Sequence, residues 1–206
     1  MNYINSTSDC LGVVLAGGLS SRMGQDKAQL QRNNSSMLEF SQHVIKASGI
    51  NNVVISGNGH QVPDLIEKAG PVGGIYSVLA QFQPKSLLIL PVDLPLMTAG
   101  ALTKLRRAGE LSQKATFFID THGKHHNIPL FLPNNAYLTL FLNQAFKATS
   151  HPQANQTNKK KGPSIKALLQ QVPNQSVSLA RNTQGGSALF NSNTPQDWQQ
   201  AQQQFT

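Results

Sequence analysis

The apolar residues of the chain fall into short continuous runs, and each of the first three runs is followed by a helical pattern. The runs at residues 12–15, 53–55 and 87–90 are rich in Val, Leu and Ile and indicate buried strands. After each run, apolar residues recur every three or four positions, as in helices that bury one face. Three such alternations in the first hundred residues predict a parallel sheet covered by helices on both faces.

Capping signals predict where several helices begin. Ser36 and Glu39 form a capping box that predicts a helix ending near Ser48. The segment Gly70–Gly74 opens a second helix, and Thr98 is the expected N-cap of a third. The predicted fold class is therefore α/β: a single-domain, three-layer sandwich with a mostly parallel, Rossmann-like sheet.

The second half of the chain has a less regular pattern. Strands are predicted at residues 115–119, 128–132, 177–180 and 188–190, and helices at 134–147, 164–171 and from 194 onward. Pro129 cannot donate a ladder hydrogen bond, so its strand is expected at a sheet edge. A polar loop is expected at 150–163. We expect residues 1–10 to be a flexible leader and residues 11–206 to be a single domain.

Composition narrows the classes of partner. The 17 Lys and Arg residues outnumber the 9 Asp and Glu residues, which gives a net charge of +8. Such an excess suits polyanions, including nucleic acid, an acidic membrane face, nucleotides and phosphorylated metabolites. The single cysteine, Cys10, provides neither an internal disulfide nor a cysteine metal cluster. Since no signal peptide and no long apolar run is present, a cytoplasmic protein is expected.

The first predicted strand leads into a loop suited to a polyphosphate. The sequence from Val13 to Lys27 is VVLAGGLSSRMGQDK. Gly17 and Gly18 let the backbone approach a ligand closely, and successive N–H groups in such a turn hold an anion. Arg22 and Lys27 add positive charge. The loop matches neither the Walker pattern nor the dinucleotide fingerprint, because their glycine spacings are absent.

Three chemically active segments follow predicted strands. They are the Gly17 loop, the Ser56–Gly59 loop and Asp93. Because ligands bind outside the carboxyl ends of parallel strands, we expect these segments to converge. Asp93 lies between two prolines that restrict the backbone, and a carboxylate there suits Mg²⁺ bridged to phosphates. Capping of the following helix is the alternative role for Asp93.

The segment Leu15–Lys27, with the pattern LAGGxSxRMGxDK, resembles the signature of nucleotidyltransferases that activate a phosphorylated small molecule with an NTP. Within that NTP-transferase family the chain is most similar to the MobA-type molybdenum cofactor guanylyltransferases. The resemblance runs from Leu11 to about Trp198 and is strongest over residues 13–27 and 70–97. It implies transfer of GMP from GTP to molybdopterin with Mg²⁺, which releases pyrophosphate and forms molybdopterin guanine dinucleotide.

The motif and the resemblance together imply the following roles, which are predictions for this chain. The catalytic residues are Arg22, Lys27 and Asp93. The nucleotide-binding residues are Leu15, Ala16, Gly17, Gly18, Lys27, Ser56, Asn58, Asp64, Gly74 and Asp93. The metal ligands are Asp93 and Asn193, the latter in a late Asn-x-Asn-Thr-Pro pattern. The position of Asp64 in the sequence is close to that of a carboxylate that, in the family, helps to select guanine. Such a carboxylate accepts hydrogen bonds from guanine N1–H and the exocyclic amine.

One departure from the family and two other functions leave alternatives open. Ser56 stands where the family has an asparagine, and Asn58 follows two residues later. The chain could instead be a cytidylyl- or uridylyltransferase for another cofactor or sugar phosphate, or a non-catalytic cofactor carrier. The expected partners are GTP, molybdopterin and molybdoenzyme-assembly proteins. We expect no binding to nucleic acid or to a membrane. The expected oligomeric state is a monomer or a weak oligomer. The Lys159–Lys161 run is interpreted as a solvated surface, with contact to the pterin phosphate as the alternative.

Overall fold

The computed structural model describes residues 10–17, 26–147, 162–179 and 188–205. Six strands form one sheet in the order β4-β1-β5-β7-β6-β8, and β2 pairs with β3 separately. The strands are β1 (Cys10–Leu15), β2 (Gln31–Arg32), β3 (Ser35–Ser36), β4 (Val53–Ser56), β5 (Ser86–Pro91), β6 (Ala115–Ile119), β7 (His125–Pro133) and β8 (Asn174–Ser178). The helices are η1 (Lys27–Gln29, a 3₁₀ turn), α1 (Met37–Ala47), α2 (Gly70–Phe82), α3 (Ala99–Ser112), α4 (Ala136–Lys147), α5 (Ile165–Leu169) and α6 (Pro195–Gln202).

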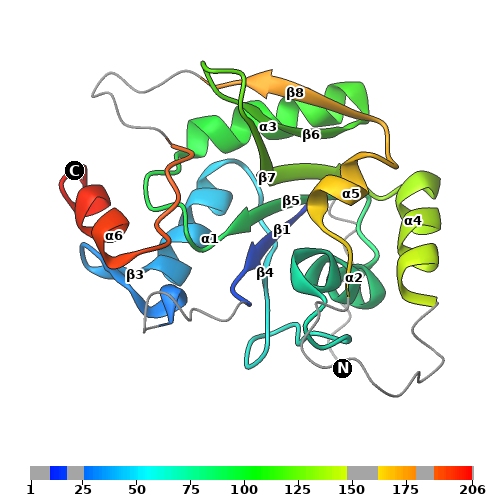
Figure 1. The fold of residues 1–206 in the computed structure, drawn as a ribbon, viewed down its shortest axis with the longest axis horizontal. Coiled ribbons are helices and arrows are strands. Elements are labelled where there is room, and N and C mark those ends of the chain that lie inside the picture. The colour runs from blue at the N-terminus through cyan, green and yellow to red at the C-terminus, as the bar shows by residue number, and fades with distance from the viewer. Residues whose placement is uncertain (1–9, 18–25, 148–161, 180–187, 206) are drawn as a thin grey trace.

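The main sheet is mostly parallel and separates two layers of helices (Figure 1). Within the described residues, β7 alone runs against the other five strands. Along β5, Leu87 and Ile89 pack in one buried cluster with α2, α4 and α5. Leu88 and Leu90 face the opposite layer, which contains α1 and α3. This alternation confirms the predicted α/β class with helices on both faces.

Local capping chemistry fixes the predicted helix starts. Ser36 and Glu39 form the predicted capping box of α1, and Thr98 caps α3. Thr194 caps α6 and forms a second capping box with Asp197. None of the helices in the described residues combines the length and apolar character required to cross a bilayer.

The prediction of an edge position for Pro129 was wrong. Its strand β7 lies between β5 and β6, well inside the sheet. The ladder between β6 and β7 shifts register here, since Phe117 pairs with Leu130 whereas Phe118 pairs with His126. Pro129 therefore sits in an irregular stretch where no ladder N–H is required, and a proline is tolerated in an internal strand.

Two other predictions at the chain level also need correction. Residues 188–190 form a turn rather than a strand, although Leu189 is buried against the α1–α3 layer. Cys10 belongs to β1 rather than to the leader, and burial raises the pKa of its thiol to about 11.

The β2–β3 pair was not predicted, although the turn residue Asn33 has a positive φ of 53°, a conformation that asparagine favours. Residues 1–9 and most of the predicted 150–163 loop lie outside the described residues.

The packing of α3 on the sheet predicts a large effect for one glycine substitution. A Cβ on Gly109 would collide with the ring of Phe131 in β7. We expect Gly109→Ala to destabilise the protein by about 2 kcal/mol, because overpacking outweighs the gain in helix propensity. Gly100→Ala is the matched control, since open space surrounds that position in the same helix. Urea unfolding should show a lower midpoint for Gly109→Ala alone; equal midpoints for both variants would contradict this packing argument.

Candidate active site

The carboxyl ends of β4, β1 and β5 lie side by side, as the parallel order predicts. Leu15 at the end of β1 pairs with Ser56 on one side and with Pro91 on the other. Past these ends, the Ala16 N–H donates to Ser56 O at 2.9 Å, and the Val92 N–H donates to Leu15 O at 3.3 Å. The loops that follow the three strands therefore leave the same edge of the sheet.

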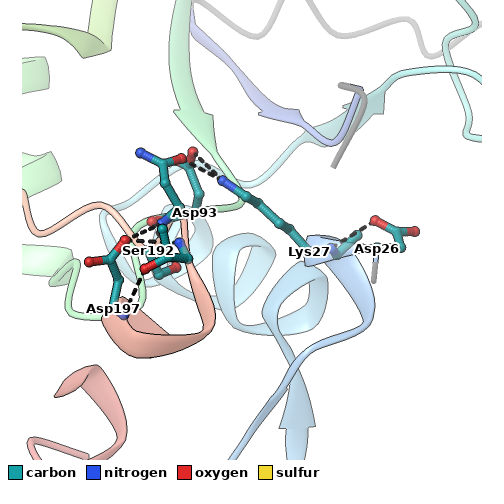
Figure 2. Close-up of polar contacts among 8 residues, drawn as sticks. Asp26, Lys27, Asp93, Ser192 and Asp197 are labelled. Carbon is teal, nitrogen blue, oxygen red and sulfur yellow. Dashed lines mark hydrogen bonds and ion pairs between the residues drawn. The ribbon is translucent and has the colours of Figure 1, made fainter. Parts of the chain in front are cut away.

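Lys27, Asp93 and Asn193 meet at this edge. Figure 2 shows the Lys27 side chain pointing toward Asp93. The Lys27 ammonium donates to Asn193 Oδ1 at 2.7 Å and lies 3.3 Å from Asp93 Oδ2. Lys27 comes from η1, Asp93 from the turn after β5, and Asn193 from the segment that precedes α6. Three predicted site residues that are far apart in the sequence thus form one polar cluster.

Backbone and capping contacts hold each of the three segments. Asp26 Oδ1 accepts from the Ala28 N–H at 3.0 Å, which caps the turn that carries Lys27. The Asp93 backbone oxygen accepts from the Ser192 N–H at 2.9 Å and from its hydroxyl at 3.3 Å. These contacts join the Asp93 turn directly to the segment that carries Asn193.

The Asp197 carboxylate holds the backbone N–H groups of Asn193 and Thr194. Its Oδ2 accepts from the Asn193 N–H at 3.0 Å and from the Thr194 N–H at 2.9 Å. Hydrogen bonds from Thr194 and Asn193, with a smaller contribution from the Lys27 charge, hold the pKa of the Asp197 carboxyl below its usual value. The carboxylate therefore stays ionised at neutral pH and keeps the start of α6 in place.

The donor set at Asp93 fits a divalent metal. Asp93 Oδ1 is buried and has no hydrogen-bond partner among the described residues. A buried carboxylate oxygen without a partner is costly, and a cation ligand would satisfy it. The described residues contain no group of three or more His, Cys, Asp and Glu side chains arranged as metal ligands. A metal here would draw its other oxygens from Asn193 and from phosphates, as Mg²⁺ commonly does.

A second group of predicted residues lies at the β1–β4 side of the edge. A Cβ placed on Gly17 would lie 3.3 Å from Gly57 Cα and 3.8 Å from Asp64 Oδ2. Asn58 Oδ1 accepts from the Asp64 N–H at 3.3 Å, so Asn58 supports the Asp64 backbone. Burial raises the pKa of the Asp64 carboxyl above its usual value. Glycine is needed at position 57, because φ is +147° and a Cβ there would meet Gly17 N at 2.7 Å.

Ser56, Gly74 and Leu15 pack together at the β1–β4 side of the edge. A Cβ on Gly74 would lie 2.8 Å from Ser56 Oγ and 3.3 Å from Leu15 Cδ2. Ser56 Oγ is buried and has no hydrogen-bond partner among the described residues. The glycine thus lets α2 approach the ends of β1 and β4 closely.

Two of the predicted site residues are not among those that the structure describes, and two residues that hold the site were not predicted. Gly18 and Arg22 lie outside the described residues. Sequence reasoning missed Ser192 and the role of Asp197 in holding Asn193. The signal for Asp197 was present in the capping pattern Thr-Pro-Gln-Asp, but no local signal indicates the backbone contact between Ser192 and Asp93.

Comparison with known proteins places this site in a family. The family model of the MobA-like NTP transferase domain matches residues 12–177. The chain belongs to this family. The match of the MobA-like domain includes Lys27 and Asp93, whereas Asn193 lies beyond it.

Curated relatives of this MobA-like chain match it over about half of its length. The molybdenum cofactor guanylyltransferase of Xanthomonas euvesicatoria pv. vesicatoria is 45% identical over 98 residues, which cover 46% of this chain and 52% of the relative. A probable molybdenum cofactor guanylyltransferase of Pelotomaculum thermopropionicum is 35% identical over 129 residues, which cover 58% of this chain and 60% of the relative. The matches thus span little more than half the length of these relatives.

Solved structures share the fold over nearly the whole chain. Molybdopterin-guanine dinucleotide biosynthesis protein A of Archaeoglobus fulgidus has a TM-score of 0.68 at 18% identity, covering 94% of this chain and 97% of that one. The 2-C-methyl-D-erythritol 4-phosphate cytidylyltransferase of Thermus thermophilus has a TM-score of 0.63 at 17% identity, with 94% and 97% coverage. At these identities the structural similarity establishes the fold but does not identify the substrate.

Proposed function

We propose that this chain transfers GMP from GTP to molybdopterin, releasing pyrophosphate and forming molybdopterin guanine dinucleotide. The observation that carries the proposal is the meeting of Lys27, Asp93 and Asn193 at the carboxyl edge of the sheet. A fixed ammonium beside a carboxylate with an unsatisfied oxygen suits a metal-bound triphosphate. The relatives named molybdenum cofactor guanylyltransferase support this choice of substrates.

The protein contributes positioning and charge neutralisation rather than a nucleophile. A phosphate oxygen of molybdopterin attacks the α-phosphorus of GTP, the bond from that phosphorus to the bridging oxygen breaks, and pyrophosphate leaves. The Lys27 ammonium offsets negative charge as pyrophosphate departs, and Arg22, which lies outside the described residues, is proposed to assist. Mg²⁺, held by Asp93 and Asn193, would neutralise further charge on the phosphate oxygens.

The β1–β4 side of the edge is proposed to bind the guanosine part of GTP. The backbone from Leu15 to Gly18 would approach the nucleotide, with Ser56, Asn58 and Gly74 beside it. Asp64 would accept hydrogen bonds from guanine N1–H and the exocyclic amine. Burial disfavours the charged form of the Asp64 carboxyl, and two donors from guanine would restore it. Guanine binding therefore satisfies a group that burial leaves poorly solvated.

Pyrophosphate release with each of the four NTPs, with and without molybdopterin, tests this function. We expect release with GTP only when molybdopterin and Mg²⁺ are both present, and its loss on adding EDTA. Release with CTP or UTP instead would favour a cytidylyl- or uridylyltransferase for another acceptor. Tight binding of molybdopterin guanine dinucleotide without any pyrophosphate release would favour a cofactor carrier.

The proposed function also implies where the chain works, which proteins receive its product and its oligomeric state. We propose that the chain works in the cytoplasm as one domain and passes its product to molybdoenzyme-assembly proteins. A monomer or weak oligomer is sufficient for this role, because the residues of the proposed site come from a single chain. Size-exclusion chromatography with light scattering would measure the oligomeric state.

A further inference from the structure

Arg32 joins the segment that carries Lys27 to the segment that carries Asp93. It lies in β2, five residues after Lys27. Its Nε donates to Pro95 O at 2.9 Å, and Pro95 is buried two residues after Asp93. A donor to a backbone oxygen so close to Asp93 restrains the path of that turn.

The same guanidinium reaches the segment that follows Asn193. Its Cζ lies 4.2 Å from the centre of the Phe40 ring in α1 and 4.7 Å from the centre of the Phe205 ring. Phe205 follows α6 and also contacts Trp198 edge-on, with ring centres 5.6 Å apart. Because Asn193 precedes α6 and Phe205 follows it, Arg32 restrains the far end of the element that begins at Asn193.

Arginine has the shape that this arrangement requires. A planar guanidinium offers two faces to aromatic rings while its N–H groups donate in the plane. A lysine would keep the positive charge but lose the flat faces and the fixed direction of the donor. The contacts of Arg32 therefore depend on its geometry as well as on its charge.

We propose that Arg32 is a positioning residue that keeps Asp93 and Asn193 at the Lys27 ammonium. Arg32 follows the Lys27 segment in the chain, contacts the Asp93 turn at Pro95 and the end of the α6 segment at Phe205, and takes no part in the cluster itself. The inference rests on the proposed function, since it concerns the geometry of that site. Small displacements of catalytic groups cost up to about 100-fold in rate, so a measurable kinetic effect follows.

Arg32→Lys and Phe205→Leu test this role, with Arg106→Lys as the control. We expect both test variants to lower kcat about 10- to 100-fold with little change in KM for GTP, because they misplace reacting groups. Phe205→Tyr should restore near-wild-type kcat, since it keeps the ring. Arg106 is also partly buried and donates to a backbone oxygen, Ser48 O at 3.3 Å, but it joins α3 to the end of α1. Arg106→Lys should therefore leave kcat unchanged.

The single tryptophan, Trp198, gives a readout that does not depend on turnover. Because its ring contacts Phe205, we expect acrylamide to quench its fluorescence more strongly in Arg32→Lys than in wild type or Arg106→Lys. Wild-type kcat and wild-type quenching in Arg32→Lys would overturn the positioning role alone. Equal loss of kcat in Arg32→Lys and Arg106→Lys would also overturn it, as a general effect of stability. A wild-type chain without turnover on any NTP would overturn the proposed function, and the positioning role with it.

Discussion

Replacing Asp93 with asparagine should lower the rate of GTP-dependent pyrophosphate release by about 10³. Asp93→Asn keeps the shape of the side chain but removes the negative charge that lies 3.3 Å from Lys27 Nζ. A neutral amide binds a divalent cation much less strongly than a carboxylate, so the triphosphate would lose its metal anchor. A continuous assay for pyrophosphate with GTP, molybdopterin and Mg²⁺ measures this effect, and titration with Mn²⁺ in the presence of GTP should show weaker metal binding.

The fold should survive this substitution. The backbone oxygen of Asp93, which accepts from Ser192, is unaffected by a change in the side chain. Glu110→Gln is the matched control, because it also removes a carboxylate paired with a cation, Arg106 at 2.8 Å. That variant should turn over at the wild-type rate. Turnover of Asp93→Asn within tenfold of wild type would mean that the metal is held elsewhere.

Features that depend on neighbouring residues were predictable from the sequence. The capping box at Ser36 was predicted, and the N-cap at Thr194 was predicted without its partner Asp197. Both boxes involve contacts between residues three positions apart, and the structure has both. The three strands of the first half were predicted for a similar reason, since continuous β-branched and leucine runs suit a strand. Burial was correctly predicted for β1 and β5, whereas β4 is an edge strand in which only alternate residues are buried. The parallel order then brought the Gly17 loop and Asp93 to one edge.

Features that depend on distant partners were predicted poorly. Pro129 violates a rule about ladder hydrogen bonds, and a change of register in the sheet removes the conflict. Nothing local distinguishes the apolar residues 188–190 from a short strand, although they form a turn. The contacts of Arg32 with Pro95 and Phe205 join residues far apart in sequence, and each partner is ordinary in its own context. The site was therefore foreseeable in its strand-end residues and not in the contacts that hold them together.

The Lys27–Asn193 contact shows the same limit within the site. Asn193 was placed near the metal through the resemblance to a family, because a separation of 166 residues leaves no local pattern to interpret. The structure adds that Lys27 contacts oxygens of both proposed metal ligands. Lys27 thus has two possible electrostatic effects, one on the triphosphate and one on metal binding, and they have opposite signs.

Lys27→Met separates these two effects. We expect the rate of pyrophosphate release to fall by about 10² to 10³, because the ammonium no longer offsets charge on the departing pyrophosphate. In the absence of nucleotide, by contrast, affinity for Mn²⁺ should rise about tenfold, because a positive charge no longer competes with the metal for Asp93 and Asn193. Turnover is measured by the pyrophosphate assay and metal affinity by calorimetry on the nucleotide-free protein.

A merely structural role for Lys27 would give a different result. Loss of stability would lower both turnover and metal affinity, whereas the electrostatic role moves them in opposite directions. Lys46→Met is the control, because Lys46 is exposed in the last turn of α1 and should change neither quantity. Weaker Mn²⁺ binding by Lys27→Met in the absence of nucleotide would show that the ammonium helps to build the metal site instead of competing for it. In that case Lys27 would help Asp93 to bind the metal, and the effect of the Lys27 charge on metal affinity would have the opposite sign to the one expected here.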